Sequence, residues 1–112
     1  MEDRESSEPG SWGDGEDHRL VVHVGGEMDI DRAPMLRNAL HAAIVQPEGP
    51  GDIVVDLAGL SFCDSSGLIA FIEAQRTAAE NGRRIVLRDP QPQIRRLLSM
   101  TGADSLFRIT HT

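Results

Sequence analysis

The chain has 112 residues, 39% of them hydrophobic, a length that fits one compact domain and excludes a large multidomain enzyme. Its net charge is −7, but residues 1–17 hold seven acids and one base (−6), which leaves ten arginines and eleven acids (−1) for the rest. This nearly neutral body lacks the dense basic face that nucleic acids require, and the longest apolar stretch, residues 67–72, is far shorter than the roughly 20 residues that cross a bilayer. We therefore expect neither a nucleic-acid partner nor a membrane partner.

The first 17 residues are rich in Ser, Gly, Pro and acidic side chains, and Trp12 is their only large apolar residue. Such a segment buries too little surface to offset its ordering entropy, so we expect a disordered acidic tail at 1–17 followed by one domain over 18–112. No basic stretch followed by an apolar run opens the sequence, and the single cysteine, Cys63, cannot form an internal disulfide. Both observations indicate a cytoplasmic protein.

Strand and helix signals alternate through the first half of the domain. Residues 20–24 form a β-branched run ended by two glycines, which predicts a strand. A helix follows, with Asp31 as the expected N-cap and Pro34 in its first turn. Its apolar residues recur three and four apart: Leu36, Leu40, Ala43 and Ile44. After a Pro- and Gly-rich break, residues 53–57 read as a strand covered on both faces, which we place at the centre of the sheet.

The second half continues the alternation. Residues 58–64 are expected to be a connection, residues 65–80 a helix that ends at Asn81 and Gly82, and residues 84–87 a third strand. The expected apolar stripe of that helix comprises Leu68, Ile69, Phe71, Ile72 and Ala79. A third helix beginning near Pro92 and stopping at Gly102 precedes a short last strand at 106–109. The pattern predicts an α/β domain with a mixed, mainly parallel sheet of four to five strands and helices packed against it.

The most informative segment is the junction at which the second helix begins. Asp64, Ser65 and Ser66 place a carboxylate and two hydroxyls where backbone N–H groups are unpaired and carry partial positive charge. From this local pattern alone, Asp64 or Ser65 reads as an N-cap. Gly67 costs helix stability relative to alanine, which indicates that something approaches the backbone closely there.

Three segments of the chain carry a family resemblance. Residues 26–29 read Gly-Glu-Met-Asp, residues 55–57 read Val-Asp-Leu with Phe-Cys-Asp-Ser-Ser-Gly-Leu at 62–68, and residues 92–107 contain Arg-Arg-Leu followed by Thr-Gly. In this order and spacing they resemble the STAS family, and within it the bacterial anti-sigma factor antagonists. The resemblance covers about four fifths of the chain, from residue 19 to residue 109.

The resemblance implies a function for each matching residue. Ser65 corresponds to the family's phosphoacceptor, Ser66 and Gly67 would shape the phosphorylation loop, and Asp64 would fix that loop and its recognition by the kinase. Asp29 corresponds to an acidic position near the partner surface. The expected partner-binding residues are therefore Asp29, Asp64, Ser65 and Ser66.

The resemblance also implies a partner-switching mechanism. The unphosphorylated protein would bind an anti-sigma factor, a serine kinase of the GHKL type, and so release a sigma factor. Phosphorylation would add about 1.5 to 2 negative charges to a surface that must lose water to dock, which would end binding. A phosphatase of the PP2C type would restore the active form.

Other classes of function have weaker support in the residues. A serine hydrolase would need an activating histidine, yet the Gly-x-Ser-x-Gly elbow is absent, and His23 and His41 fall on a predicted strand and helix. A phosphoaspartate receiver uses a lysine, and this chain has none. The pairs Asp29 with Asp31 and Asp52 with Asp56 lack histidine or cysteine ligands at recognised spacing. We expect no enzyme activity, cofactor or metal.

Cys63 reads as a small buried hydrophobe without a redox function. The arginine pairs at 83–84 and 95–96 are expected on solvated edges and helix faces, with Arg95 or Arg96 available to a partner. A STAS domain that is never phosphorylated and acts as a scaffold or ligand-sensing module remains an alternative, because the Asp-Ser-Ser-Gly segment indicates competence for phosphorylation and not its occurrence.

Overall fold

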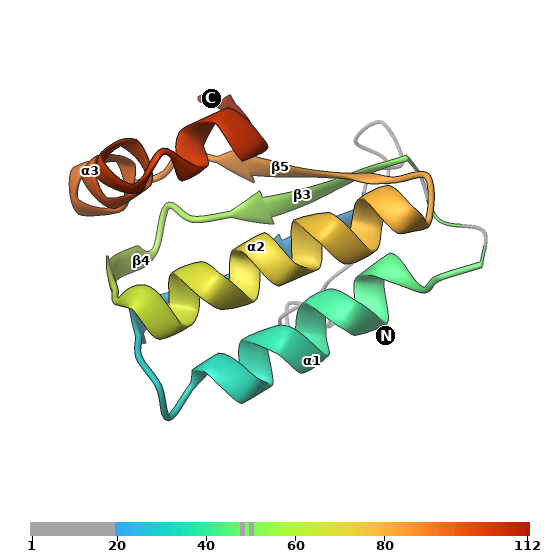
Figure 1. Ribbon diagram of the computed structural model, residues 1–112, viewed down its shortest axis with the longest axis horizontal. Helices are drawn as coiled ribbons and strands as arrows, with labels where there is room; N and C mark the ends of the chain where they lie inside the picture. Colours follow the sequence, from blue (N-terminus) through green and yellow to red (C-terminus); the bar gives the residue numbers. More distant parts are fainter. Residues whose placement is uncertain (1–19, 48, 50) are drawn as a thin grey trace, which may run out of the picture.

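A four-stranded parallel sheet forms the centre of the computed structural model, which describes residues 20–47, 49 and 51–112. Its strands lie in the order β1-β3-β5-β6, and their bounds are β1 (Leu20–His23), β3 (Asp52–Asp56), β5 (Arg84–Arg88) and β6 (Arg108–Thr110). Three helices accompany the sheet: α1 (Ala33–Ile44), α2 (Ser65–Glu80) and α3 (Pro92–Thr101). Figure 1 shows α1 and α2 side by side beneath the strands. The predicted α/β class and parallel sheet are confirmed.

All three helices contribute to one core on one face of the sheet. Residues that alternate along the strands, such as Ile53 and Val55, point toward buried side chains of α1, α2 and α3. The residues between them, Val21, Val54 and Val86, form a separate small cluster in register across β1, β3 and β5. Ile53, Val54 and Val55 are all fully buried, which confirms that this strand is central.

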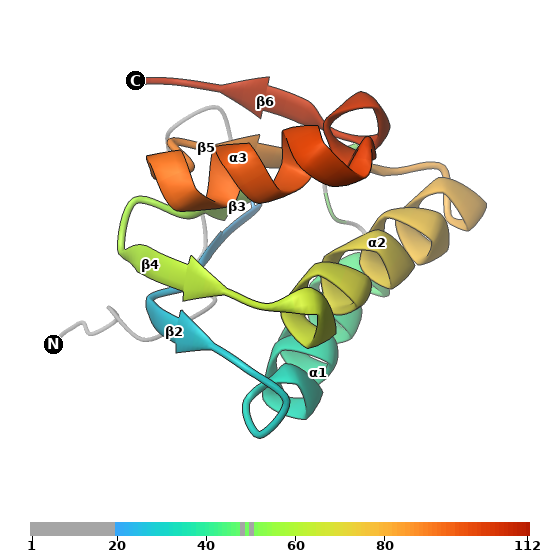
Figure 2. The same cartoon turned by 60° about the vertical axis from the view of Figure 1, so that its left-hand side comes forward.

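A second sheet of two parallel strands was not predicted. It consists of β2 (Gly26–Met28) and β4 (Leu60–Cys63), and Met28 pairs with Cys63. The stretch expected to be a plain connection therefore contains a strand, and the first strand ends at His23 rather than at Val24. β4 buries its two end residues and exposes the two between them, so it lacks the alternation by which strands are recognised. As Figure 2 shows, β2 leads toward α1 and β4 leads directly into α2.

The helix ends were predicted with mixed success. Helix α2 spans the expected residues, and Gly82 follows it with φ of +71°. The expected N-cap of α1, Asp31, is wrong: Arg32 occupies that position without a side-chain cap. Two members of the expected α2 stripe, Ile69 and Ala79, are exposed. The buried face consists of Gly67, Leu68, Ala70, Phe71, Ala74 and Ala78.

Arg83 and Arg84 were expected on a solvated edge, but both side chains bond to other segments of the structure. The Arg83 guanidinium donates to the carbonyl oxygens of Ala43, Ile44 and Gln46 at the end of α1. Arg83 thus satisfies carbonyl groups that a helix end leaves unpaired. Arg84 forms an ion pair with the Asp52 carboxylate at 3.1 Å.

The end of the chain also differs from the expectation. Residues 103–106 form a short 3-10 helix, η2 (Ala103–Leu106), so the last strand begins at Arg108 instead of Leu106. The predicted tail at residues 1–17 lies outside the described residues. Within the described part of the chain, no helix combines the length and the apolar character needed to cross a membrane.

Candidate functional site

Ser65 is the first residue of α2, and its side chain is exposed. The residue before it, Asp64, is the N-cap: its Oδ1 accepts hydrogen bonds from the amides of Ser66 at 2.9 Å and Gly67 at 3.2 Å. This arrangement satisfies two of the four amides that a helix start leaves unpaired. Asp64 therefore caps the helix, which leaves the hydroxyl of Ser65 available for other interactions.

Backbone contacts attach this junction to both neighbouring elements. The amide of Asp64 donates to the carbonyl oxygen of Met28, at the end of β2, at 3.1 Å. On the other side, the side-chain amide of Gln93 from α3 bonds both the N–H and the carbonyl group of Cys63. Gln93 was not singled out in the sequence, because no motif marks a glutamine that bonds to a strand edge.

The first turn of α2 packs closely on the two short strands. Gly67 is buried, and a Cβ added to it would lie 2.6 Å from both the Cys63 sulfur and Cγ of Met28. The expected close approach to this glycine is thus made by the protein's own core. A larger residue at this position would displace the start of α2, and with it Ser65 and Asp64.

Cys63 has the buried environment expected of a small hydrophobe. Its side chain is 2% exposed, and Sγ donates to the carbonyl oxygen of Asp64 at 3.3 Å. Burial, with a smaller contribution from the negative charge of Asp64, raises the pKa of the Cys63 thiol to about 11. The thiolate form that redox and nucleophilic chemistry require is therefore disfavoured at neutral pH.

Asp29 lies at the same end of the molecule as Ser65. It follows Met28 directly, as Asp64 follows Cys63, and Met28 and Cys63 are paired in the two-stranded sheet. One carboxylate oxygen of Asp29 accepts the amides of Asp31 and Arg32, each at 3.1 Å, and so fixes the turn before α1. Asp29 has this structural function whether or not it also contacts a partner.

Exposed apolar side chains lie on the three segments that meet at this end. Ile30 is 70% exposed in the turn after β2, Phe62 is 42% exposed on β4, and Ile69 is 48% exposed one helical turn after Ser65. Ile69 was expected in the apolar stripe of α2, whereas no expectation concerned Ile30 or Phe62. Single exposed apolar residues are common, so no sequence signal distinguishes them. In the structure they lie on the segments that the Met28–Cys63 pair and the Asp64–Met28 hydrogen bond bring together.

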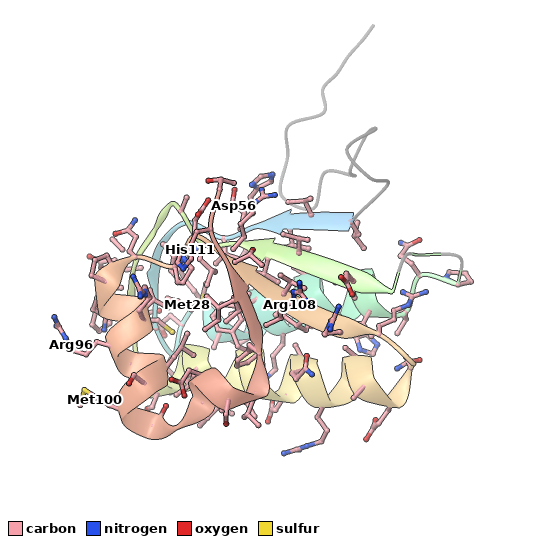
Figure 3. The ribbon with its side chains drawn as sticks, turned by 90° about the horizontal axis from the view of Figure 1, so that it is seen from above. Met28, Asp56, Arg96, Met100, Arg108 and His111 are labelled. Carbon is pink, nitrogen blue, oxygen red and sulfur yellow. The ribbon has the colours of Figure 1, made fainter. Side chains whose placement is uncertain are left out.

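A cluster of charged residues lies at the ends of β1, β3 and β5 in the four-stranded sheet. The Asp56 carboxylate, at the end of β3 (Figure 3), lies 3.0 Å from Nδ1 of His23 and 3.3 Å from the Arg88 guanidinium. Burial raises the pKa of Asp56, but the hydrogen bonds from the Ala58 amide and Arg88, with the charges of Arg88 and His23, outweigh it, and the pKa is lowered overall. His23 is thus placed with Asp56 rather than with Ser65.

The carboxylate pairs considered as metal ligands have other partners. Asp52 pairs with Arg84, Asp56 with Arg88, and Asp29 bonds the amide of Asp31. Across residues 20–47, 49 and 51–112, no group of three or more His, Cys, Asp or Glu side chains could hold a metal ion. The described arrangement is a surface at which a capped helix start carries an exposed hydroxyl.

The chain is similar to a known family of domains and to several characterised proteins. A family model described as "Mlab, STAS domain" matches residues 13–109. The anti-sigma-B factor antagonist of Staphylococcus epidermidis is 32% identical over 88 residues, which cover 79% of this chain and 80% of that protein. A crystal structure of an anti-sigma factor antagonist from Mycobacterium paratuberculosis is 32% identical, with a TM-score of 0.70, over 85% of this chain and 79% of that one. The structure of the Bacillus cell fate determinant SpoIIAA in its phosphorylated form is 25% identical, with a TM-score of 0.63, over 81% of each chain.

Proposed function

The chain belongs to the STAS domain family, and from this premise we propose that it is an anti-sigma factor antagonist whose binding is switched off by phosphorylation of Ser65. The relatives that carry this name support the first part of the proposal. The single observation that carries the second part is the position of Ser65, an exposed hydroxyl at the capped start of α2.

The capping of α2 by Asp64 supports a switch in which the phosphoryl group on Ser65 stays exposed at the protein surface. Because Oδ1 of Asp64 already accepts the amides of Ser66 and Gly67, a phosphoryl group on Ser65 would not find these donors free. It would add about 1.5 to 2 negative charges beside an existing carboxylate. The phosphoryl group would therefore stay exposed, and a partner docking there would have to desolvate it.

The exposed apolar side chains near Ser65 support a protein partner. Ile30, Phe62 and Ile69 offer apolar area on the three segments that meet at this end of the molecule. A partner that covers Ile69, one helical turn after Ser65, would also lie over Ser65. The desolvation cost of a phosphorylated serine in such an interface is several kcal/mol, and each 1.4 kcal/mol lowers affinity tenfold. One modification would thus be sufficient to release the partner.

In this proposal the protein is not an enzyme, and it works in the cytoplasm. Its partner is an anti-sigma factor that is also a serine kinase of the GHKL type, and a phosphatase of the PP2C type reverses the modification. Asp29, Asp64, Ser65 and Ser66 contribute to the partner surface. Asp64 also raises the free energy of the phosphorylated form by charge repulsion, which leaves the switch readily reversed.

The experiment that tests the proposal is phosphorylation with mass mapping. The purified chain is incubated with ATP and with each GHKL-type kinase encoded in the same genome. We expect one phosphate on Ser65, none on Ser65→Ala, and unchanged incorporation in Ser99→Ala, which removes an exposed serine hydroxyl on α3. Absence of phosphate with every kinase, together with retained binding to one of them, would instead favour the scaffold or ligand-sensing alternative.

A further inference from the structure

A glutamine from α3 takes the place of a neighbouring strand beside β4. The Cys63 amide donates to Oε1 of Gln93 at 3.2 Å, and Nε2 of Gln93 donates to the Cys63 carbonyl oxygen at 3.4 Å. One side chain thus supplies the acceptor and the donor that a strand would offer. β2 pairs with the opposite edge of β4 in the two-stranded sheet, so Gln93 satisfies the second edge of β4 at Cys63.

The backbone from which Gln93 projects is itself anchored. Gln93 lies in the first turn of α3, whose Ile94 and Leu98 are each 2% exposed in the core. The side chain of Gln91 donates to the carbonyl oxygen of Ala58 at 2.6 Å and ties the start of the helix to the segment before β4. The Gln93 amide is therefore presented from a fixed base.

The residue held by Gln93 immediately precedes the candidate switch. Cys63 leads into Asp64, whose carboxylate fixes the amides of Ser66 and Gly67 and so sets the start of α2. We propose that Gln93 is a positioning residue for Ser65: by holding the Cys63 backbone from α3, it fixes the orientation in which the serine hydroxyl is presented to a kinase. This inference rests on the proposed function, and it requires no contact between Gln93 and Ser65.

The first test compares Gln93→Ala with Gln91→Ala, which removes the other glutamine contact of the same turn and leaves Cys63 bonded. In Gln93→Ala we expect hydrogen exchange of the Cys63 amide to accelerate about tenfold or more and the Ser65 and Ser66 amide resonances to shift. The specificity constant for phosphorylation of Ser65 should fall about fivefold, which corresponds to the loss of a hydrogen-bonding contribution of about 1 kcal/mol. Because Gln91 only steadies the base of α3 and both bonds to Cys63 remain, Gln91→Ala should change all three clearly less than Gln93→Ala does.

Two results distinguish the inference from the function on which it rests. If the wild-type chain is not phosphorylated but Gln93→Ala still moves the Ser65 and Ser66 resonances, the proposed function fails and the positioning by Gln93 stands. If Gln93→Ala leaves those resonances and the phosphorylation of Ser65 as in the wild type, the inference is overturned. Equal effects of the Gln91 and Gln93 variants would overturn it too, because they would reflect general loosening of α3.

A second test uses pH to restore the missing donor. The ionised carboxylate of Gln93→Glu accepts from the Cys63 amide but cannot donate to the Cys63 carbonyl group, whereas the protonated acid can do both. The ratio of Cys63 amide exchange in Gln93→Glu to that in the wild type should therefore fall toward one as the pH falls from 7 to about 3, through the ordinary glutamate pKa of about 4.3. The nearby charged groups, Asp64 and Arg96, are common to both proteins, and the Cys63 thiol, with a pKa of about 11, stays protonated. A ratio independent of pH would contradict the two-bond geometry.

Discussion

The backbone of Gly67 lies against the thiol of Cys63 so closely that a Cβ on the glycine would be 2.6 Å from the sulfur. Met28 approaches the same point from β2, with its Cγ also at 2.6 Å. Through this contact the first turn of α2 lies directly on the two-stranded sheet. Because Gly67 has no side chain, the first turn of α2 can lie this close to the two-stranded sheet, and this close packing sets the position of Ser65.

This contact predicts that Gly67→Ala destabilises the protein although alanine favours helices. The added methyl group must displace the side chains of Cys63 and Met28 or lift the start of α2, at a cost of about 1 to 3 kcal/mol, against a gain of up to about 1 kcal/mol from helix propensity. Urea denaturation should show a net loss. Gly51→Ala is the matched control, because no atom lies within 4 Å of a Cβ there, and it should change stability by less than about 0.5 kcal/mol. A Gly67→Ala protein as stable as the wild type would show that the packing is not tight.

The cap at Asp64 predicts a difference between two substitutions. Asp64→Ala removes the acceptor for the amides of Ser66 and Gly67 and should lower the free energy of unfolding by about 1 kcal/mol. Asp64→Asn keeps an acceptor oxygen in the same place, so less than half of that loss is expected. Equal losses in the two variants would mean that the charge of Asp64, and not its hydrogen bonds, stabilises the helix start.

The environment of Asp56 predicts a pH dependence of stability. Its folded pKa is lowered, because its bonds to Ala58 and Arg88 and the nearby charges outweigh the effect of burial. The carboxylate therefore contributes stability that is present above its unfolded pKa of about 3.9 and is lost as pH falls through the folded value. Asp56→Asn should be less stable than the wild type at pH 7, and the difference should shrink below about pH 4 in urea titrations. A difference that is constant from pH 7 to pH 2 would refute this assignment.

The burial of Cys63 predicts an unreactive thiol. With its pKa raised to about 11, the thiol is almost wholly protonated at pH 7.5, and its side chain is 2% exposed. Alkylation by iodoacetamide should be at least about 100-fold slower in the native protein than in 6 M urea. The control is Ser61→Cys in a Cys63→Ala background, which places a thiol at an exposed position of the same strand and should react readily. Rapid native alkylation of Cys63 would contradict the buried geometry.

The main elements of the fold could be predicted because their signals are local. The apolar run at 53–57 and the spacing through 65–80 identified the central strand and the longest helix. β2 and β4 could not be predicted in this way, because each is three or four residues long and is stable only through its partner. The prediction that Asp31 caps α1 was wrong because Asp29, and not Asp31, supplies the carboxylate that fixes the turn before the helix.

The candidate site was predicted in part. The motif located Ser65 and Asp64 at the start of a helix, and that position is confirmed. The contacts that hold the junction come from residues distant in sequence, such as Met28 and Gln93, and only the tertiary structure brings them there. Ile69 was assigned to the core by its helical spacing, yet it is 48% exposed. Ile30 and Phe62 were missed because no sequence signal marks a single exposed apolar residue.

A charge on Ser65 should end binding to an anti-sigma factor, and calorimetric titration with that partner measures this effect. The protein is prepared unmodified, stoichiometrically phosphorylated on Ser65, and as Ser65→Ala, which cannot be modified. A charge-operated switch at Ser65 predicts comparable affinity for the unmodified and alanine forms and at least about 100-fold weaker binding of the phosphorylated form, corresponding to a cost of about 3 kcal/mol. Affinities of the phosphorylated and unmodified forms that agree within about threefold would contradict it.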